Sequence, residues 1–273
     1  MAWDFAAEIH NLTNFDADDT STTATSGEVL SAHATQWLTD GARDVINALS
    51  KNPQYLNLMS SVSTLNASST TFSLTNGMIG DVSLFDGTRL QGCRAISPNM
   101  RGRASDINDL MNYATTSDPV YWINAKTLET YPTPTDSNYA HVTTVSYPSV
   151  AYSDSSISSF PDEAEHLVVL YACQKALQYQ MNAMNASIAH SDQDGTWTSV
   201  NTSGENQGWE EVRYWLENEE DSEMSAATVQ ALSAEFQQFI HEYTWYQSQL
   251  KSLKEDYQQG IAMLVGGGQP QPK

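Results

Sequence analysis

Histidines are the residues of this chain that could bind a transition metal, yet their spacing does not favour a site. Two histidine ligands on one helical face need a separation of three or four positions, as in HExxH, and no pair has it. The sequence contains no CxxC motif either. We therefore predict no metal ligand among the six histidines, which are His10, His33, His141, His166, His190 and His241.

Carboxylates could bind calcium or hydrolyse glycosides, and neither pattern is complete. The segment SDQDGT at 191–196 resembles half of a calcium loop but does not meet the EF-hand pattern with its bidentate acid at position twelve. The pairs Glu210–Glu211 and Glu219–Glu220 lie in a charged run, whereas a glycosidase holds two acids apart in a cleft. Nucleophile-elbow, phosphate-loop and dinucleotide-binding motifs are also missing. The sequence thus predicts no catalytic residue, no cofactor and no enzyme.

Arginines form the one local reversal of charge. The chain has a net charge of -21, from 12 basic and 33 acidic residues, which argues against a nucleic-acid-binding surface. Four of the basic residues nevertheless fall within fifteen positions: Arg89, Arg94, Arg101 and Arg103. They are either surface arginines that interrupt an acidic chain or residues that meet the acidic segments of a neighbouring copy, because arginine is enriched at interfaces.

The composition indicates a globular chain without a membrane span. The hydrophobic content of 40% over 273 residues is enough to form a core, and no run of about 18 apolar residues occurs. Cys93 and Cys173 lie in a predicted β segment and a predicted helix, so we expect both to be reduced and buried. These observations predict one α+β domain over residues 1–273, mainly α.

The elements that must position these residues begin with a helix over 26–50 and a β insertion over 64–148. Within the insertion, three strands at 120–123, 128–131 and 141–147 predict an antiparallel meander whose apolar face is covered by a helix.

Two further helices are predicted from steps of three and four between apolar residues. The first spans 161–190 and begins with acids after Pro161; the second spans 225–264, and an acidic loop segment over 191–223 separates them. We expect the two helices to pack antiparallel through a seam that includes Leu167, Leu177, Phe236, Phe239, Tyr243, Tyr246 and Leu250. Residues 265–273, rich in glycine and proline, predict an extended tail.

The sheet-to-helix junction resembles the head-tail adaptor (connector) proteins of tailed bacteriophages. The resemblance rests on VYWINAKTLETYPTPT, on TTVSYP, on the helix start PDEAEHLVVLYACQKAL, and on an N-terminal helix followed by a small sheet. It covers roughly residues 26–190 and excludes the long C-terminal helix.

The resemblance implies a helical bundle with a β insertion, assembled as a ring of twelve copies beneath the portal. Such proteins are not enzymes and have no cofactor. They are made in the host cytoplasm and lie in the virion neck, where they contact the portal protein and a tail or nozzle protein. Double-stranded DNA would pass through the bore without specific binding, because acidic segments repel phosphate. No membrane is involved.

Under this reading the arginines contact a neighbouring copy, and the tail docks on the portal. The interface residues we expect are Arg89, Arg94, Arg101, Arg103, Val265, Gln269, Pro270 and Lys273. A tail-tube or tail-terminator component is the alternative, which would place the ring within the tail. A virion-associated hydrolase is a third reading, and it would require two convergent acids in a cleft.

Overall fold

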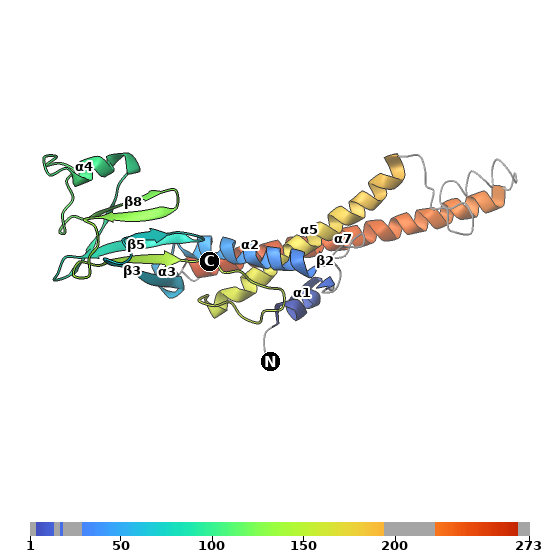
Figure 1. Cartoon of the computed structure of the whole chain (residues 1–273). Coiled ribbons are helices and arrows are strands. Elements are labelled where there is room, and N and C mark those ends of the chain that lie inside the picture. The colour runs from blue at the N-terminus through green and yellow to red at the C-terminus, as the bar shows by residue number, and fades with distance from the viewer. Residues whose placement is uncertain (1–3, 14–16, 19–28, 194–221, 267–273) are drawn as a thin grey trace, which may run out of the picture. The chain divides into compact units, whose positions relative to one another are not determined.

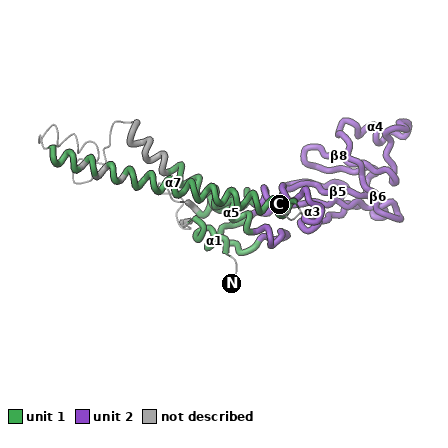
Figure 2. Tube along the Cα trace, turned by 180° about the vertical axis from the view of Figure 1, so that it is seen from behind, with its two compact units in different colours: residues 1–41, 150–156, 166–273 green, residues 42–149, 157–165 purple. Residues whose placement is uncertain are grey.

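A computed structural model describes residues 4–13, 17–18, 29–193 and 222–266 of the chain. Within these residues the structure contains long helices and two four-stranded sheets whose strand pairs are mostly antiparallel (Figure 1). The predicted class, α+β and mainly α, is therefore confirmed. The chain divides into two compact units (Figure 2). We call Met1–Gly41, Val150–Ser156 and His166–Lys273 the helical unit, and Ala42–Ser149 with Ile157–Glu165 the β unit. The expectation of a single domain over 1–273 stays a prediction.

The long helices are α2 (Ser31–Leu49), α5 (Asp162–Gln193) and α7 (Ser222–Gly266), and a shorter helix, α1 (Phe5–Thr13), precedes them. Between α1 and α2, strands β1 (Ala17–Asp18) and β2 (Val29–Leu30) form a short parallel pair. The three long helices correspond to the predicted helices over 26–50, 161–190 and 225–264. Acids in the first turn of α5 interact favourably with the positive end of its dipole.

Helices α5 and α7 lie side by side within the helical unit (Figure 1) and run antiparallel. The Gln174 side-chain amide donates to the Leu253 carbonyl at 3.2 Å, and the rings of Tyr171 and Tyr257 lie 6.0 Å apart. A Cβ at Gly260 would lie 2.4 Å from Cδ2 of the buried Leu167, so this glycine permits the close approach. The predicted antiparallel pairing of these helices is confirmed at these contacts.

Helix α5 is also covered by α2. Gly41 of α2 lies against Tyr171, where an added Cβ would be 3.1 Å from the tyrosine Cβ. Leu38 of α2 and Ala172 of α5 are fully buried. The apolar residues of α5 are therefore covered by its own chain, both by α2 and by α7.

The β unit begins with the end of α2 and with α3 (Pro53–Met59), which Asn52 caps by accepting a hydrogen bond from the Gln54 amide at 3.1 Å. Two four-stranded sheets follow. The first has the order β3-β10-β5-β6 and the second β4-β9-β8-β7. Their strands are β3 (Ser60–Leu65), β4 (Thr71–Ser73), β5 (Met78–Phe85), β6 (Leu90–Gly92), β7 (Arg94–Ala95), β8 (Val120–Asn124), β9 (Thr127–Tyr131) and β10 (Ala140–Val145).

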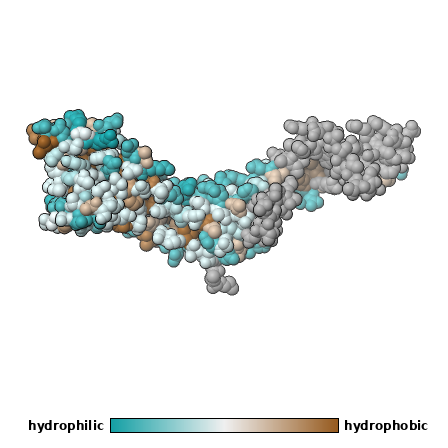
Figure 3. Space-filling model, in the orientation of Figure 1, coloured by the Kyte–Doolittle hydropathy of each residue, from teal (hydrophilic) through white to brown (hydrophobic). Residues whose placement is uncertain are grey.

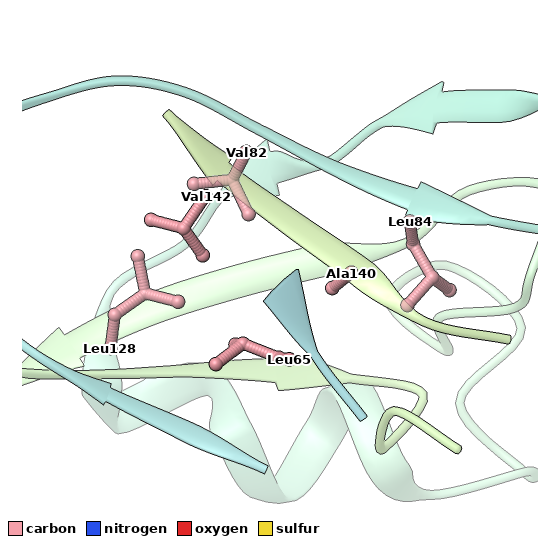
Figure 4. Close-up of a cluster of buried hydrophobic side chains, with 6 residues drawn as sticks. All are labelled: Leu65, Val82, Leu84, Leu128, Ala140 and Val142. Carbon is pink, nitrogen blue, oxygen red and sulfur yellow. The ribbon is translucent and has the colours of Figure 1, made fainter. Parts of the chain in front are cut away.

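The predicted three-stranded meander is wrong in its pairing. Strands β8 and β9 form a hairpin, but β10 lies in the other sheet, between β3 and β5. One buried cluster joins Leu128 of the second sheet to Leu65, Val82 and Val142 of the first (Figure 4). The face of the hairpin that carries Leu128 is thus covered by the first sheet, not by a helix. Pairing with β3 and β5 keeps the backbone of β10 hydrogen-bonded on both edges.

A second cluster supports the segment between β7 and β8. Ala104 and Ala114 are buried against Val120 and Trp122, and the indole of Trp122 donates to Glu129 at 3.1 Å. Ala104 belongs to α4 (Arg101–Ser105), which follows the 3-10 helix η1 (Pro98–Met100). The cluster anchors both ends of the loop that leaves α4.

Candidate assembly surfaces

The clustered arginines are all in the β unit, on or beside its strands and α4. Three of them form ion pairs: Arg89 with Asp86 at 3.9 Å, Arg94 with Asp118 at 3.2 Å, and Arg103 with Asp109 at 2.7 Å. Arg101 is exposed and forms no ion pair with any described residue. The surface around these arginines is therefore less positive than their spacing in the sequence implies. Their role at an interface stays a prediction.

A loop after α4 exposes apolar side chains. We define residues 106–113 as the tip loop. Within it the exposed fractions are 69% for Ile107, 93% for Leu110 and 87% for Met111. Figure 3 shows a hydrophobic patch at the end of the β unit that carries α4. Exposed apolar residues in such a group mark contact sites more often than single exposed residues do.

Short hydrogen bonds hold the tip loop in its conformation. The Asp106 carboxylate accepts from the Asn108 amide at 2.9 Å, and the Asp109 carboxylate accepts from the Asn112 side chain at 2.9 Å. The Arg103 guanidinium donates to Asp109 at 2.7 Å. Bonds from Asn112 and Arg103 lower the pKa of Asp109, so it stays charged well below neutral pH. The exposed side chains are thus presented by an ordered backbone.

Periodicity does not reveal the tip loop. The signal is the spacing of aspartate and asparagine in DINDLMN, because these side chains bond to backbone amides two or three positions on. Apolar residues between such turns have no strand or helix face on which to be buried. The exposed residues next to Arg101 and Arg103 were missed for this reason.

The predicted helix seam is unevenly buried. Leu167 and Leu177 of α5 are fully buried, whereas Phe239, Tyr243, Tyr246 and Leu250 of α7 are half-buried. Phe236 is 57% exposed. Among the described side chains of α7, Leu253 is the buried large apolar residue. The apolar residues of α7 are therefore buried around Leu253 and become exposed toward Phe236.

The predicted tail has a single described interface residue, Val265, which is half-buried in the last turn of α7. The helix continues to Gly266. Gln269, Pro270 and Lys273 lie outside the described residues, as does most of the acidic segment predicted over 191–223.

The described residues include no group of three His, Cys, Asp or Glu side chains that could hold a metal ion. No described helix is both long and apolar enough to cross a membrane. Cys173 is buried, as expected, but Cys93 is only half-buried, because β7 and β6 are short edge strands; both are free. Burial raises the pKa of each thiol to about 12, so both are neutral at physiological pH.

The chain matches a known protein family over most of its length. Residues 6–198 match the family model described as SU10 adaptor protein. The match runs from α1 through the β unit and α5, and it ends before α7. No curated protein matches the chain. The chain belongs to the SU10 adaptor protein family, a family of structural adaptor proteins of phage virions, and the predicted resemblance is confirmed.

Proposed function

We propose that this adaptor forms a ring beneath the portal and joins the capsid to the tail. Membership of the family, over residues 6–198, is the observation that carries the proposal. The ring has twelve copies, contacts the portal protein on one side and a tail or nozzle protein on the other, and lies in the virion neck. Helices and sheets with exposed apolar residues supply the unlike faces that a closed ring requires.

Passage of DNA through the bore follows from the charge. A chain with a net charge of -21 repels the phosphate backbone, so double-stranded DNA passes without being held. The exposed apolar residues and the ion pairs of the β unit fit protein contacts instead.

The tip loop and the arginines beside it are the contacts that we assign to neighbouring virion proteins. Leu110 and Met111 supply apolar anchors, and Arg101 supplies a charge without a partner in the described residues. The ion pair of Arg94 is solvent-exposed, and such pairs stabilise by at most about 1 kcal/mol. Arg94 can therefore exchange Asp118 for a carboxylate on a neighbouring protein at little cost in free energy. The tail from Val265 adds a contact with the portal.

The test is reconstitution with the portal protein of the same virus. Mass photometry and cryo-electron microscopy of the mixture should show a twelvefold ring seated on the portal. Monomers that never associate with the portal would contradict the proposal. A sixfold ring that binds tail proteins on both sides would instead identify a tail-tube or tail-terminator component.

The adaptor role is structural, and we propose that it involves no catalysis. Purified protein incubated with a panel of capsular polysaccharides should release no reducing ends above a buffer blank. Turnover that scales with protein concentration and survives repurification would contradict this part of the proposal.

A further inference from the structure

The β unit is built in three layers, with the hairpin of β8 and β9 in the middle. Leu128 of this hairpin packs against the first sheet, whereas Val120 and Trp122 pack against Ala104 and Ala114, which flank the tip loop. Figure 1 shows α4 and the first sheet on opposite sides of β8. The tip loop and the outward face of the first sheet are therefore presented on opposite sides of one unit.

The outward face of the first sheet carries a continuous apolar strip. Leu90 of β6 is the register partner of Phe85 on β5, and the rings of Phe85 and Tyr139 stack with their centroids 4.9 Å apart. The ring of His141, on β10, lies 5.0 Å from that of Tyr139. The residues that alternate with them along β5 and β10 are buried between the two sheets, so these four face outward. We call the four residues the aromatic strip, in which Leu90 is 48% exposed and the three rings are half-buried.

Gly92 leaves open space beside the aromatic strip. It is the register partner of Ser83 and lies two positions from Leu90, so it belongs to the same face of the sheet. A Cβ added at Gly92 would meet no atom within 4 Å, and its φ lies outside the left-handed region that favours glycine. Neither the backbone nor the packing within the chain therefore requires glycine here. Glycine weakens a strand, and in a strand it often marks a site where another molecule approaches closely.

The tip loop presents side chains that can fill this space. Leu110 and Met111 are 93% and 87% exposed, and hydrogen bonds within the loop hold the backbone that carries them. An ordered loop loses little conformational entropy when it docks. A leucine side chain seated over Gly92 would lie beside Leu90 and exclude water from the end of the aromatic strip.

Charge favours the same pairing of surfaces. Arg101, beside the tip loop, is exposed and has no ion pair with any described residue. Asp81 on β5 and Asp136 in the turn before β10 flank the aromatic strip, and both are exposed without an ion pair in the described part of the chain. Arg89, at the end of the strip, is paired with Asp86. The rim of the strip thus has an excess of acid that complements the unpaired guanidinium beside the tip loop.

We propose that the tip loop of each copy docks on the aromatic strip of the next copy, with Leu110 over Gly92. This inference rests on the proposed ring, and it names another copy as the neighbour that the tip loop contacts. Two unlike surfaces on opposite sides of one unit form a heterologous contact, and the ring closes when every copy uses both. Arg101 then reaches the carboxylates at the rim of the strip.

The variant Gly92→Phe tests the docking site. The monomer should fold, since the added ring enters open space, but this ring occupies the place of Leu110. The concentration of half-assembly should rise about tenfold or more by mass photometry, with or without portal. Ala227→Phe adds the same side chain at an exposed position of α7 and should stay within about threefold of wild type. A Gly92→Phe variant that is folded by circular dichroism and assembles like wild type overturns the inference.

Cysteine cross-linking identifies the occupant and does not depend on the first variant. The background is Cys93→Ser, because Cys93 is free and adjacent to Gly92. Full-length protein with Gly92→Cys and Leu110→Cys should give, after oxidation, a ladder of covalent multimers under denaturing conditions. A mixture of the two single variants should give dimers and nothing larger, and neither single variant should give dimers by itself.

The failures of this experiment are distinguishable. Dimers from Leu110→Cys alone would show a like-to-like contact and overturn the inference. Rings that form on the portal without the ladder would show that the tip loop contacts the portal or a tail protein, so the inference fails and the proposed function stands. Wild-type protein that forms no ring at all would contradict both.

Discussion

The β unit and helix α7 differ in how far their apolar residues are buried. Leu65, Leu84 and Leu128 of the β unit are closed between two sheets of the same chain. Along α7 the large apolar residues are mostly half-buried or exposed, and Leu253 is the buried one among those described. The sandwich therefore completes its own core, whereas α7 keeps much of its apolar surface exposed.

This difference separates stability from assembly. A residue closed inside the sandwich contributes to folding of the monomer, because its removal leaves a cavity. An exposed residue on α7 or in the tip loop contributes little to folding and can contribute to association. Four pairs of substitutions test this division.

The sandwich should show the largest loss. Leu128→Ala removes a fully buried side chain and should lower the free energy of unfolding by about 3 kcal/mol. Leu110→Ala, in the tip loop, should change it by less than about 0.5 kcal/mol, because that leucine is 93% exposed. Urea denaturation followed by circular dichroism measures both. Equal losses would mean that the tip loop belongs to the folded core.

A second pair compares two positions of α7. Leu253→Ala should cost about 2.5 kcal/mol, because the leucine is buried beside α5. Phe236→Ala should cost less than about 1 kcal/mol in the monomer despite the larger side chain. Thermal melts at concentrations below assembly give the values. A loss near 3 kcal/mol for Phe236→Ala would show that its ring is buried in the monomer.

Glycines on α7 provide the third pair. Gly260→Val places a Cβ too close to Leu167 and should destabilise by about 2 kcal/mol through overpacking. Gly266→Val, which has open space around its Cβ position, should stay within about 0.5 kcal/mol. The comparison is made by urea denaturation of both variants. If Gly260→Val were neutral, the close approach of α5 and α7 would not be required.

The smallest expected effect has opposite signs in the two regions. Lys126 in the turn between β8 and β9 has a φ of 67°, which favours glycine, so Lys126→Gly should stabilise by about 0.5 kcal/mol. Lys254→Gly in α7 should destabilise by about 1 kcal/mol, because glycine disfavours a helix. Differential scanning calorimetry would detect shifts of opposite direction. A fall in Tm for Lys126→Gly would show that its side chain stabilises the turn.

The helices could be predicted from the sequence because helical periodicity is local. Apolar residues at steps of three and four define α5 and α7, and the same steps predict their antiparallel contact. The acids after Pro161 mark where α5 begins, since they interact with its own first turn. Each of these signals lies within a few residues of the feature that it predicts.

The sandwich could not be predicted in the same way. The hairpin of β8 and β9 is local, but β10 pairs with β3 and β5, and its Val142 lies opposite Ser63 on β3. The sequence of β10 shows which of its residues are apolar, but it does not indicate which strands lie beside it. The choice of sheet is made by long-range packing.

The candidate contacts divide along the same line. The sequence determined the helices, the arginine cluster and the family resemblance, because these depend on residue type and local spacing. The tertiary structure decided that three arginines are paired within the β unit, that the tip loop exposes its apolar residues, and that α7 is covered by α5 on one side. Burial and pairing depend on residues distant in the chain, so only the folded arrangement determines them.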